Sequence, residues 1–158
     1  MRAFVSVVER VGASGEREGL PFAAMSMTEL GRIALDEGKD GEARTLGDRA
    51  LELWLELKQA RRFEVADAMA LVGAAALRQS DFEPAAAFLE TACEIYGGCT
   101  VDVRARHATA ATGLARALEG LGKREEARRG YERALDLFRE GDAARVEIEQ
   151  RILELSRG

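Results

Sequence analysis

The chain has 158 residues, of which 47% are hydrophobic, and a formal net charge of −5 at pH 7. These values suit one compact domain or a short solenoid, and they exclude a disordered chain. The negative charge argues against a nucleic-acid-binding surface, which would need a clustered basic face. With two prolines and no asparagine, the composition favours helix almost everywhere.

No apolar run approaches the roughly 20 residues that a membrane-spanning helix needs. The opening segment, residues 1–10, becomes charged too early for a secretory signal. The two cysteines, Cys93 and Cys99, form neither a disulfide framework nor a metal-ligand spacing. We therefore expect a cytoplasmic protein that does not act at a membrane.

Similar residues recur along the chain at an offset of 42 positions. A fixed period of about 20–50 residues is typical of stacked repeats, in which each unit buries its apolar face only against its neighbours. The pattern therefore predicts a scaffold. The aligned sets are Ala24, Ala66 and Ala108; Leu30, Val72 and Leu114; Gly31, Gly73 and Ala115; Ala43, Ala85 and Ala127; Ala50, Ala92 and Ala134; and Trp54, Tyr96 and Phe138.

Residues 1–20 lie where a preceding unit would end. One period upstream of the first copy, Phe4–Val11 is expected to be the last part of that unit's second helix, and Gly12–Gly19 the following loop. The run Phe4–Val8 also has strand propensity. Helix is the preferred interpretation, because a lone strand would have no partner.

The next 120 residues contain three copies, and each copy predicts two helices separated by a breaker. The copies are 21–60, 61–100 and 101–140, and the breakers are Gly38, Ser80 and Gly122. In the second copy, Asp81 is expected to cap the second helix, and Pro84 falls within its first turn.

Small residues mark the expected helix contacts. Two antiparallel helices approach to about 8–10 Å only where the contact carries small side chains. Gly31 is therefore expected to face Ala43, and the later alanine of each copy is expected to leave room for the next unit. The corresponding pairs are Gly73 with Ala85 and Ala115 with Ala127, and the later alanines are Ala50, Ala92 and Ala134.

After the third copy, residues 141–158 predict a C-terminal capping helix. Asp142 is expected to cap a helix from Ala143 to Ser156, at the place where a fourth first helix would begin. Its many charged residues suit the polar outer face that a solenoid needs at its end.

The third copy resembles the tetratricopeptide repeat (TPR) family. The matching residues are Leu114, Ala115, Gly122, Ala127, Tyr131, Ala134 and Leu135, and similar offsets occur twice upstream. The resemblance implies an all-α fold, a right-handed α-solenoid of three TPR-like helical hairpins with partial flanking helices.

The chain departs from the family pattern in two ways. The large residue that the family has at the start of the first helix is only Met27, Met69 or Ala111 here, and the unit has 42 residues instead of 34. The added residues are expected after the Ala-Leu pair of the second helix, shared between that helix and the next one. Trp54, Tyr96 and Phe138 lie in this extension and are expected to pack the longer helix ends. Long units of this kind resemble those of the kinesin light chain and of many bacterial regulatory proteins.

The sequence offers little for catalysis. His107 is the single histidine, which excludes sites built from paired histidines. The segment Gly120–Lys123 resembles part of a phosphate loop, but the rest of that motif is missing and no strand precedes it. We expect no enzyme, no cofactor and no metal site. An enzyme of unrecognised helical type would require a pocket with a perturbed ionisable group.

In the TPR family the first helices line a concave groove in which a peptide usually lies. The resemblance therefore implies a set of groove positions in each copy. They are Met25, Thr28, Arg32, Leu35 and Asp36; Asp67, Ala70, Ala74, Leu77 and Arg78; and Thr109, Thr112, Arg116, Glu119 and Gly120.

Arginines recur along this face at positions 32, 78 and 116. They are suited to hold carboxylates or backbone carbonyls of a ligand. Alternatively, they pair with Asp36, Asp67 and Glu119 at a solvated surface. Family members that clamp a terminal carboxylate do so with asparagines, which this chain lacks, so that mode of binding is not expected.

The sequence thus predicts a protein–protein interaction scaffold that binds a peptide or a helix, as a regulatory or recruitment module of a larger bacterial protein or complex. Nucleic acid and membrane are not expected partners. An alternative is a self-associating module that forms a homodimer through the open ends of the solenoid.

Overall fold

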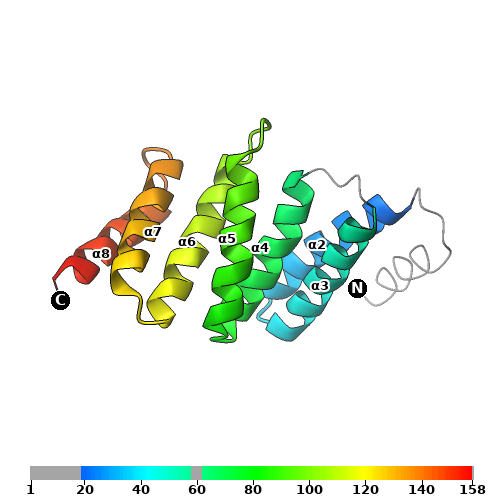
Figure 1. The fold of residues 1–158 in the computed structure, drawn as a ribbon, viewed down its shortest axis with the longest axis horizontal. Coiled ribbons are helices and arrows are strands. Elements are labelled where there is room, and N and C mark those ends of the chain that lie inside the picture. Colours follow the sequence, from blue (N-terminus) through cyan, green and yellow to red (C-terminus); the bar gives the residue numbers. More distant parts are fainter. Residues whose placement is uncertain (1–18, 58–61, 158) are drawn as a thin grey trace.

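The computed structural model describes residues 19–57 and 62–157. Within them the chain forms a row of α-helices that lie side by side (Figure 1). The helices are α2 (Leu20–Asp36), α3 (Asp40–Glu56), α4 (Arg62–Arg78), α5 (Phe82–Gly97), α6 (Arg104–Gly120), α7 (Arg124–Leu137) and α8 (Ala144–Ser156). The expected segment Phe4–Val11 lies outside the described residues.

Consecutive helices pair into three antiparallel hairpins, α2–α3, α4–α5 and α6–α7, and α8 packs on α7. The expected all-α solenoid of three hairpins is confirmed. We call α2, α4 and α6 the first helices and α3, α5 and α7 the second helices. The second helices α3 and α5 also contact the first helix of the next hairpin, so the hairpins stack in one direction along the row.

The first helices form the more closely spaced row. α4 contacts both α2 and α6, in addition to its hairpin partner α5. Across the described residues, the second helices have no comparable contact with one another. The side with the shorter spacing is the inner side of a curved stack, so the first helices lie on the inner side.

The three hairpins turn in the same way. The expected breakers Gly38, Ser80 and Gly122 have φ of 77°, 60° and 73°. In the first turn, the Lys39 amide donates to the Ala34 carbonyl at 2.8 Å and the Gly38 amide to Leu35 at 3.0 Å. The other two turns have the same pair of bonds. This is the Schellman arrangement, which satisfies the last carbonyls of the first helix and needs a left-handed residue.

Two expected caps are wrong in detail. Asp81 stands at the N-cap of α5, but its side chain makes no capping bond. Its Oδ2 instead lies 3.0 Å from Arg44 Nη1, because the charged partner on α3 competes for it. Asp142 accepts a bond from the Arg139 amide at 2.8 Å, so it closes the preceding turn, and α8 begins two residues later at Ala144.

Small residues produce the predicted seams between helices. A Cβ at Gly31 would lie 3.3 Å from the Ala43 carbonyl, and a Cβ at Gly73 would lie 3.3 Å from that of Ala85. Ala92, expected to meet the following unit, is fully buried. These expected contacts are confirmed. Ala115 and Ala127 are likewise buried in one cluster.

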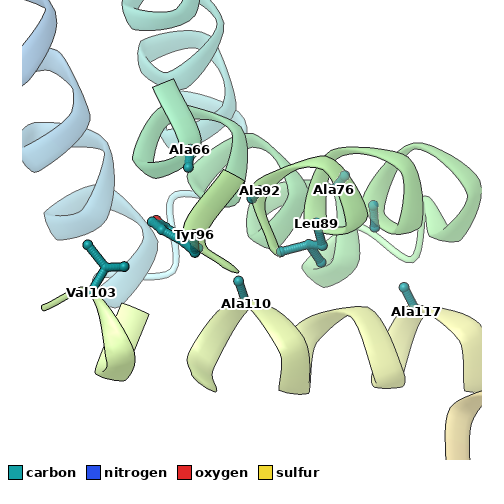
Figure 2. Close-up of a cluster of buried hydrophobic side chains, with 9 residues drawn as sticks. Ala66, Ala76, Leu89, Ala92, Tyr96, Val103, Ala110 and Ala117 are labelled. Atoms are coloured by element: carbon teal, nitrogen blue, oxygen red, sulfur yellow. The ribbon is translucent and has the colours of Figure 1, made fainter. Parts of the chain in front are cut away.

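The core between the hairpins is built mostly from alanine (Figure 2). Leu89 of α5 is its largest fully buried side chain, and it lies between α4 and α6. Trp54 and Tyr96 are buried near the ends of their second helices, as expected. Phe138 is half-buried and lies just beyond α7, because its backbone is extended.

The turns predict opposite effects of two substitutions. A left-handed conformation costs a non-glycine residue about 1–2 kcal/mol. Glycine avoids this strain, but it loses more conformational entropy on folding, which offsets part of the gain. We expect Ser80→Gly to raise the free energy of unfolding by about 0.5–1 kcal/mol. Gly122→Ala should lower it by about 1 kcal/mol, although a Cβ there meets no atom within 4 Å. Urea denaturation measures both, and shifts in the same direction would contradict the assignment.

The seams predict that Gly73→Ala destabilises the chain. Its Cβ would lie 2.7 Å from Leu89 Cγ, and Leu89 is buried on all sides. Overpacking of this kind costs about 1–3 kcal/mol, against a gain in helix propensity of about 1 kcal/mol. Gly41→Ala is the matched control, because its Cβ meets nothing within 4 Å. Thermal unfolding should show a lower Tm for the first variant and an unchanged or higher Tm for the second.

Candidate binding surface

The first helices carry all of the expected groove positions, but the structure distributes these residues between the surface and the interior. Met25, Asp36, Thr109 and Arg116 are exposed, and Arg32 and Ala74 are partly exposed. We call Met25, Arg32, Ala74, Thr109 and Arg116 the inner surface. These five residues belong to the first helices, which form the inner side of the stack, and each is at least partly accessible.

The three threonines of the set are engaged with their own helices. Thr28 is only 4% exposed, and its hydroxyl donates to the Ala24 carbonyl at 3.0 Å. Thr109 and Thr112 donate in the same way to Ala105 and Ala108. Thr28 therefore lies beneath the surface, whereas Thr109 keeps an exposed hydroxyl oxygen as an acceptor.

Asp67 is part of an internal polar cluster. The Tyr96 hydroxyl donates to Asp67 Oδ1 at 2.5 Å, and Arg106 Nη1 lies 3.5 Å from Asp67 Oδ2. The Arg106 guanidinium also stands over the Phe63 ring, 5.8 Å from its centroid. The Asp67 side chain is 11% exposed. This cluster joins α4, α5 and α6, and it raises the pKa of Tyr96 above its ordinary value, mainly through burial and then through the bond to Asp67.

The arginines differ in role. Arg78 donates from Nη1 to the Leu35 carbonyl at 2.7 Å, and its Nε lies 2.9 Å from Asp40 Oδ1. It thus ties the end of α4 to the end of α2 and the start of α3. Arg32 pairs with Glu29 at 3.0 Å, within α2. Arg116 pairs with Glu147 of α8 at 2.5 Å.

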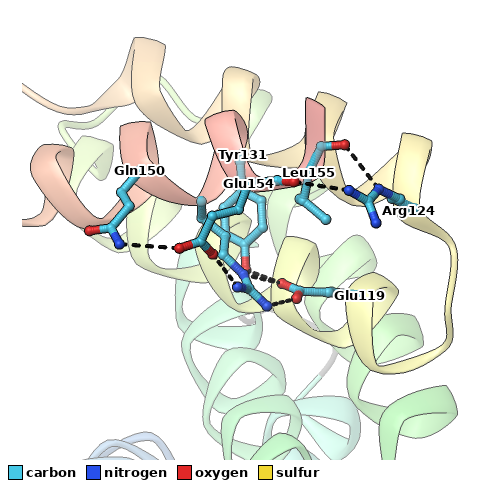
Figure 3. Close-up of polar contacts among 7 residues, drawn as sticks. Glu119, Arg124, Tyr131, Gln150, Glu154 and Leu155 are labelled. Carbon is cyan, nitrogen blue, oxygen red and sulfur yellow. Dashed lines mark hydrogen bonds and ion pairs between the residues drawn. The ribbon is translucent and has the colours of Figure 1, made fainter. Parts of the chain in front are cut away.

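Of the partners expected for these arginines, Glu119 belongs to a different network (Figure 3). It accepts from the Tyr131 hydroxyl at 3.1 Å and from Arg151 Nε at 2.9 Å. Arg151 also pairs with Glu154. Glu119 therefore links α6, α7 and α8, and the arginine pairs differ from those expected.

The remaining expected positions are apolar or small. Leu35 and Leu77 are partly buried against core clusters of the first and second hairpins. Ala70 also packs on the core, while Ala74 lies one turn further along α4. Gly120 packs closely on α5, since a Cβ there would lie 2.4 Å from the Phe82 ring and would displace it.

Three arginines that sequence reasoning did not single out bind the carbonyl ends of other helices. Arg124 Nε donates to Leu155 at 2.9 Å, and Arg104 Nε donates to Leu137 at 2.7 Å. Arg145 donates to Leu135 at 3.0 Å. Each stands in the first turn of its own helix. A cation is unfavourable in the first turn, because the helix N-terminus is already positive. An arginine at such a position is therefore the sequence signal that its side chain binds a group outside its own helix.

The other reactive side chains are set in apolar surroundings. The His107 ring lies 6.1 Å from that of Tyr96, and burial lowers the pKa of His107. Burial raises the pKa of the Cys93 thiol to about 11, so it is protonated at neutral pH. Within residues 19–57 and 62–157, no group of His, Cys, Asp and Glu side chains is arranged to hold a metal. None of the helices described there is long and apolar enough to cross a membrane.

The stacked hairpins, their left-handed turns and their small-residue seams define an α-helical repeat protein. Family models described as tetratricopeptide repeat match residues 22–97 and 107–140. The chain therefore belongs to the tetratricopeptide repeat family, as its sequence indicated. Repeats of this family generally mediate protein–protein interaction and act as non-catalytic scaffolds.

A solved structure with the same fold is that of BtubC (BKLC) from P. vanneervenii. The match has a TM-score of 0.61 and 23% sequence identity, and it covers 96% of this chain and 61% of that protein. The chain thus spans about three fifths of that protein's length. No curated protein matches the sequence.

The Tyr96–Asp67 bond predicts a measurable contribution to stability. A net hydrogen bond to a charged group is worth about 1.5–3 kcal/mol. We expect Tyr96→Phe to lower the free energy of unfolding by about 1–2 kcal/mol, because the buried carboxylate then loses its shortest bond. Tyr131→Phe is the matched control and should cost less, since Glu119 keeps its bonds to Arg151. If both variants lost the same free energy of unfolding in urea denaturation, the Asp67 carboxylate would not depend on the Tyr96 hydroxyl as proposed.

Proposed function

We propose that the chain binds a segment of another protein, an extended peptide or a helix, across the inner surface. The proposal is supported by the register of three side chains. Arg32, Ala74 and Arg116 occupy equivalent positions in α2, α4 and α6. The small Ala74 thus stands between two arginines and leaves space for a ligand side chain at the centre of the row.

The two arginines are available for exchange with a ligand. Arg32 and Glu29 are 40% and 65% exposed, and Arg116 and Glu147 are 49% and 73% exposed. Exposed ion pairs of this kind contribute about 0–1 kcal/mol. A ligand carboxylate or carbonyl can therefore replace the glutamate at little cost. Arg78 is excluded from this role, because it is held by Leu35 and Asp40.

These features describe a ligand with a bulky apolar side chain near its middle and acceptor groups on either side. The apolar group would contact Ala74, and Met25, which is 50% exposed two turns before Arg32 on α2, offers a second apolar contact further along the surface. The acceptors would meet Arg32 and Arg116. In this role the chain is a recruitment module of a larger bacterial protein or complex in the cytoplasm, and it acts by holding its partner in place.

The test uses peptides selected from a random display library against the native chain. Ala74→Arg should weaken their binding at least tenfold, about 1.4 kcal/mol, because it fills the central space. The fold accommodates this change, since Arg32 and Arg116 occupy the same register. Ala87→Arg, at an exposed alanine of α5, is the matched control and should bind as the native chain does.

Circular dichroism would establish that both variants keep their helices. Peptides that bind all three chains equally would place the contact elsewhere. A library that yields no peptide for the native chain would also count against the proposal.

A further inference from the structure

The N-terminal end of the stack has an apolar helix face without a described partner. In α4, Leu71 and Ala75 point toward the first hairpin and are buried against it. A Cβ added at Gly31 would lie 2.4 Å from Leu71 Cδ2, which shows how closely this face fits. The equivalent face of α2 carries Phe22, Ser26, Glu29 and Ile33. Phe22 is 66% exposed and Ile33 is 47% exposed.

The other end of the stack is built differently. In each hairpin, the first helix meets its second helix through alanine or glycine at two fixed positions. The corresponding residues of α8 are Gln150 and Arg157. Gln150 replaces Ala24, Ala66 and Ala108, which are all buried. The face of α8 is therefore polar at these two positions, although Val146 and Leu153 of α8 are also exposed.

The segment before α2 carries the apolar pattern of a second helix. Phe4, Val5, Val8 and Val11 are one period upstream of four α3 residues, Leu46, Gly47, Ala50 and Leu53. These α3 positions face the next hairpin: a Cβ at Gly47 would lie 2.7 Å from Val72, and Ala50 shares a core cluster with Ala68. The pattern therefore matches a surface that receives a first helix.

The connection to α2 is long enough for this segment to fold back. Five residues, 57–61, connect α3 to α4, and six, 98–103, connect α5 to α6. Residues 12–19 provide eight between Val11 and Leu20. An antiparallel return along α2 thus needs no more chain than the other hairpins use.

We propose that residues 4–11 of the same chain dock on the outer face of α2, in the place of a preceding second helix. Val8 then meets Ser26, as Ala50 meets Ala68, and Phe4 and Val5 cover Ile33. This proposal concerns the end of the stack and is independent of ligand binding at the inner surface.

The face favours the chain's own segment over a second copy. In a two-fold dimer the same patch meets itself. Glu29, which lies between Ser26 and Ile33, would then approach Glu29 of the other copy. A tethered segment instead has a high effective concentration, on the order of millimolar for short linkers. It also places Val5 beside the Glu29 stem and leaves the carboxylate at the surface, where it pairs with Arg32 in the free chain.

Amide hydrogen exchange of the full chain tests the proposal. We expect the amides of residues 4–11 to exchange at least tenfold more slowly than in an unstructured peptide of the same sequence. Val8→Asp and Ile33→Asp should each abolish this protection while α4–α8 stay protected. Ser6→Asp is the matched control, because its register carries the exposed residues Asp48 and Glu90, and it should leave the protection unchanged.

Two results would overturn the proposal. Exchange of residues 4–11 at the unstructured rate in the native chain would show that the segment does not dock. Protection that increases with protein concentration, together with a dimer in sedimentation, would identify a second copy as the occupant. Neither result would affect peptide binding at Ala74, so failure here is distinguishable from failure of the proposed function.

Discussion

The close approach of the two helices within each hairpin determines the rest of the structure. Gly31 and Gly73 bring each first helix against a backbone carbonyl of its partner, so the contact excludes a larger side chain. The cores consist mostly of alanine, which buries little apolar area per residue. Dispersion contacts then depend on short interhelical distances, because they weaken steeply across a small gap. A stack of alanine-lined helices is thus stable only while its seams remain narrow.

Charged side chains join neighbouring helices, within a hairpin or between hairpins, where the seams end. Arg78, Arg104 and Arg124 each donate to the terminal carbonyls of a neighbouring helix. These carbonyls carry the negative end of the helix dipole and have no partner within their own helix. The arginines therefore give these terminal carbonyls a charged donor and hold the ends of the joined helices together. The inner surface keeps its shape for the same reason, since its three helices are fastened at their ends.

The fold was largely predictable because its determinants are local and repeat. The period placed Gly31 against Ala43, and the breakers Gly38 and Gly122 marked the turns. The binding surface was less predictable, because side-chain partners come from a neighbouring hairpin. Asp67 and Glu119 were expected at the surface by family register, yet Tyr96, Arg106 and Arg151 draw them into internal networks. A register specifies which face of a helix a residue occupies, but not which cation from the next unit reaches it.

The nearest-neighbour contacts of the hairpins have a consequence for how the chain loses its structure. Each described helix packs on its neighbours in the row, and the contacts among the first helices also join adjacent hairpins. The α4–α5 hairpin is enclosed on both sides, whereas α8 has a neighbour on one side only. Fraying at the C-terminal end therefore leaves the α4–α5 hairpin intact. On heating, we expect local unfolding to begin at the ends of the stack and to reach its centre last.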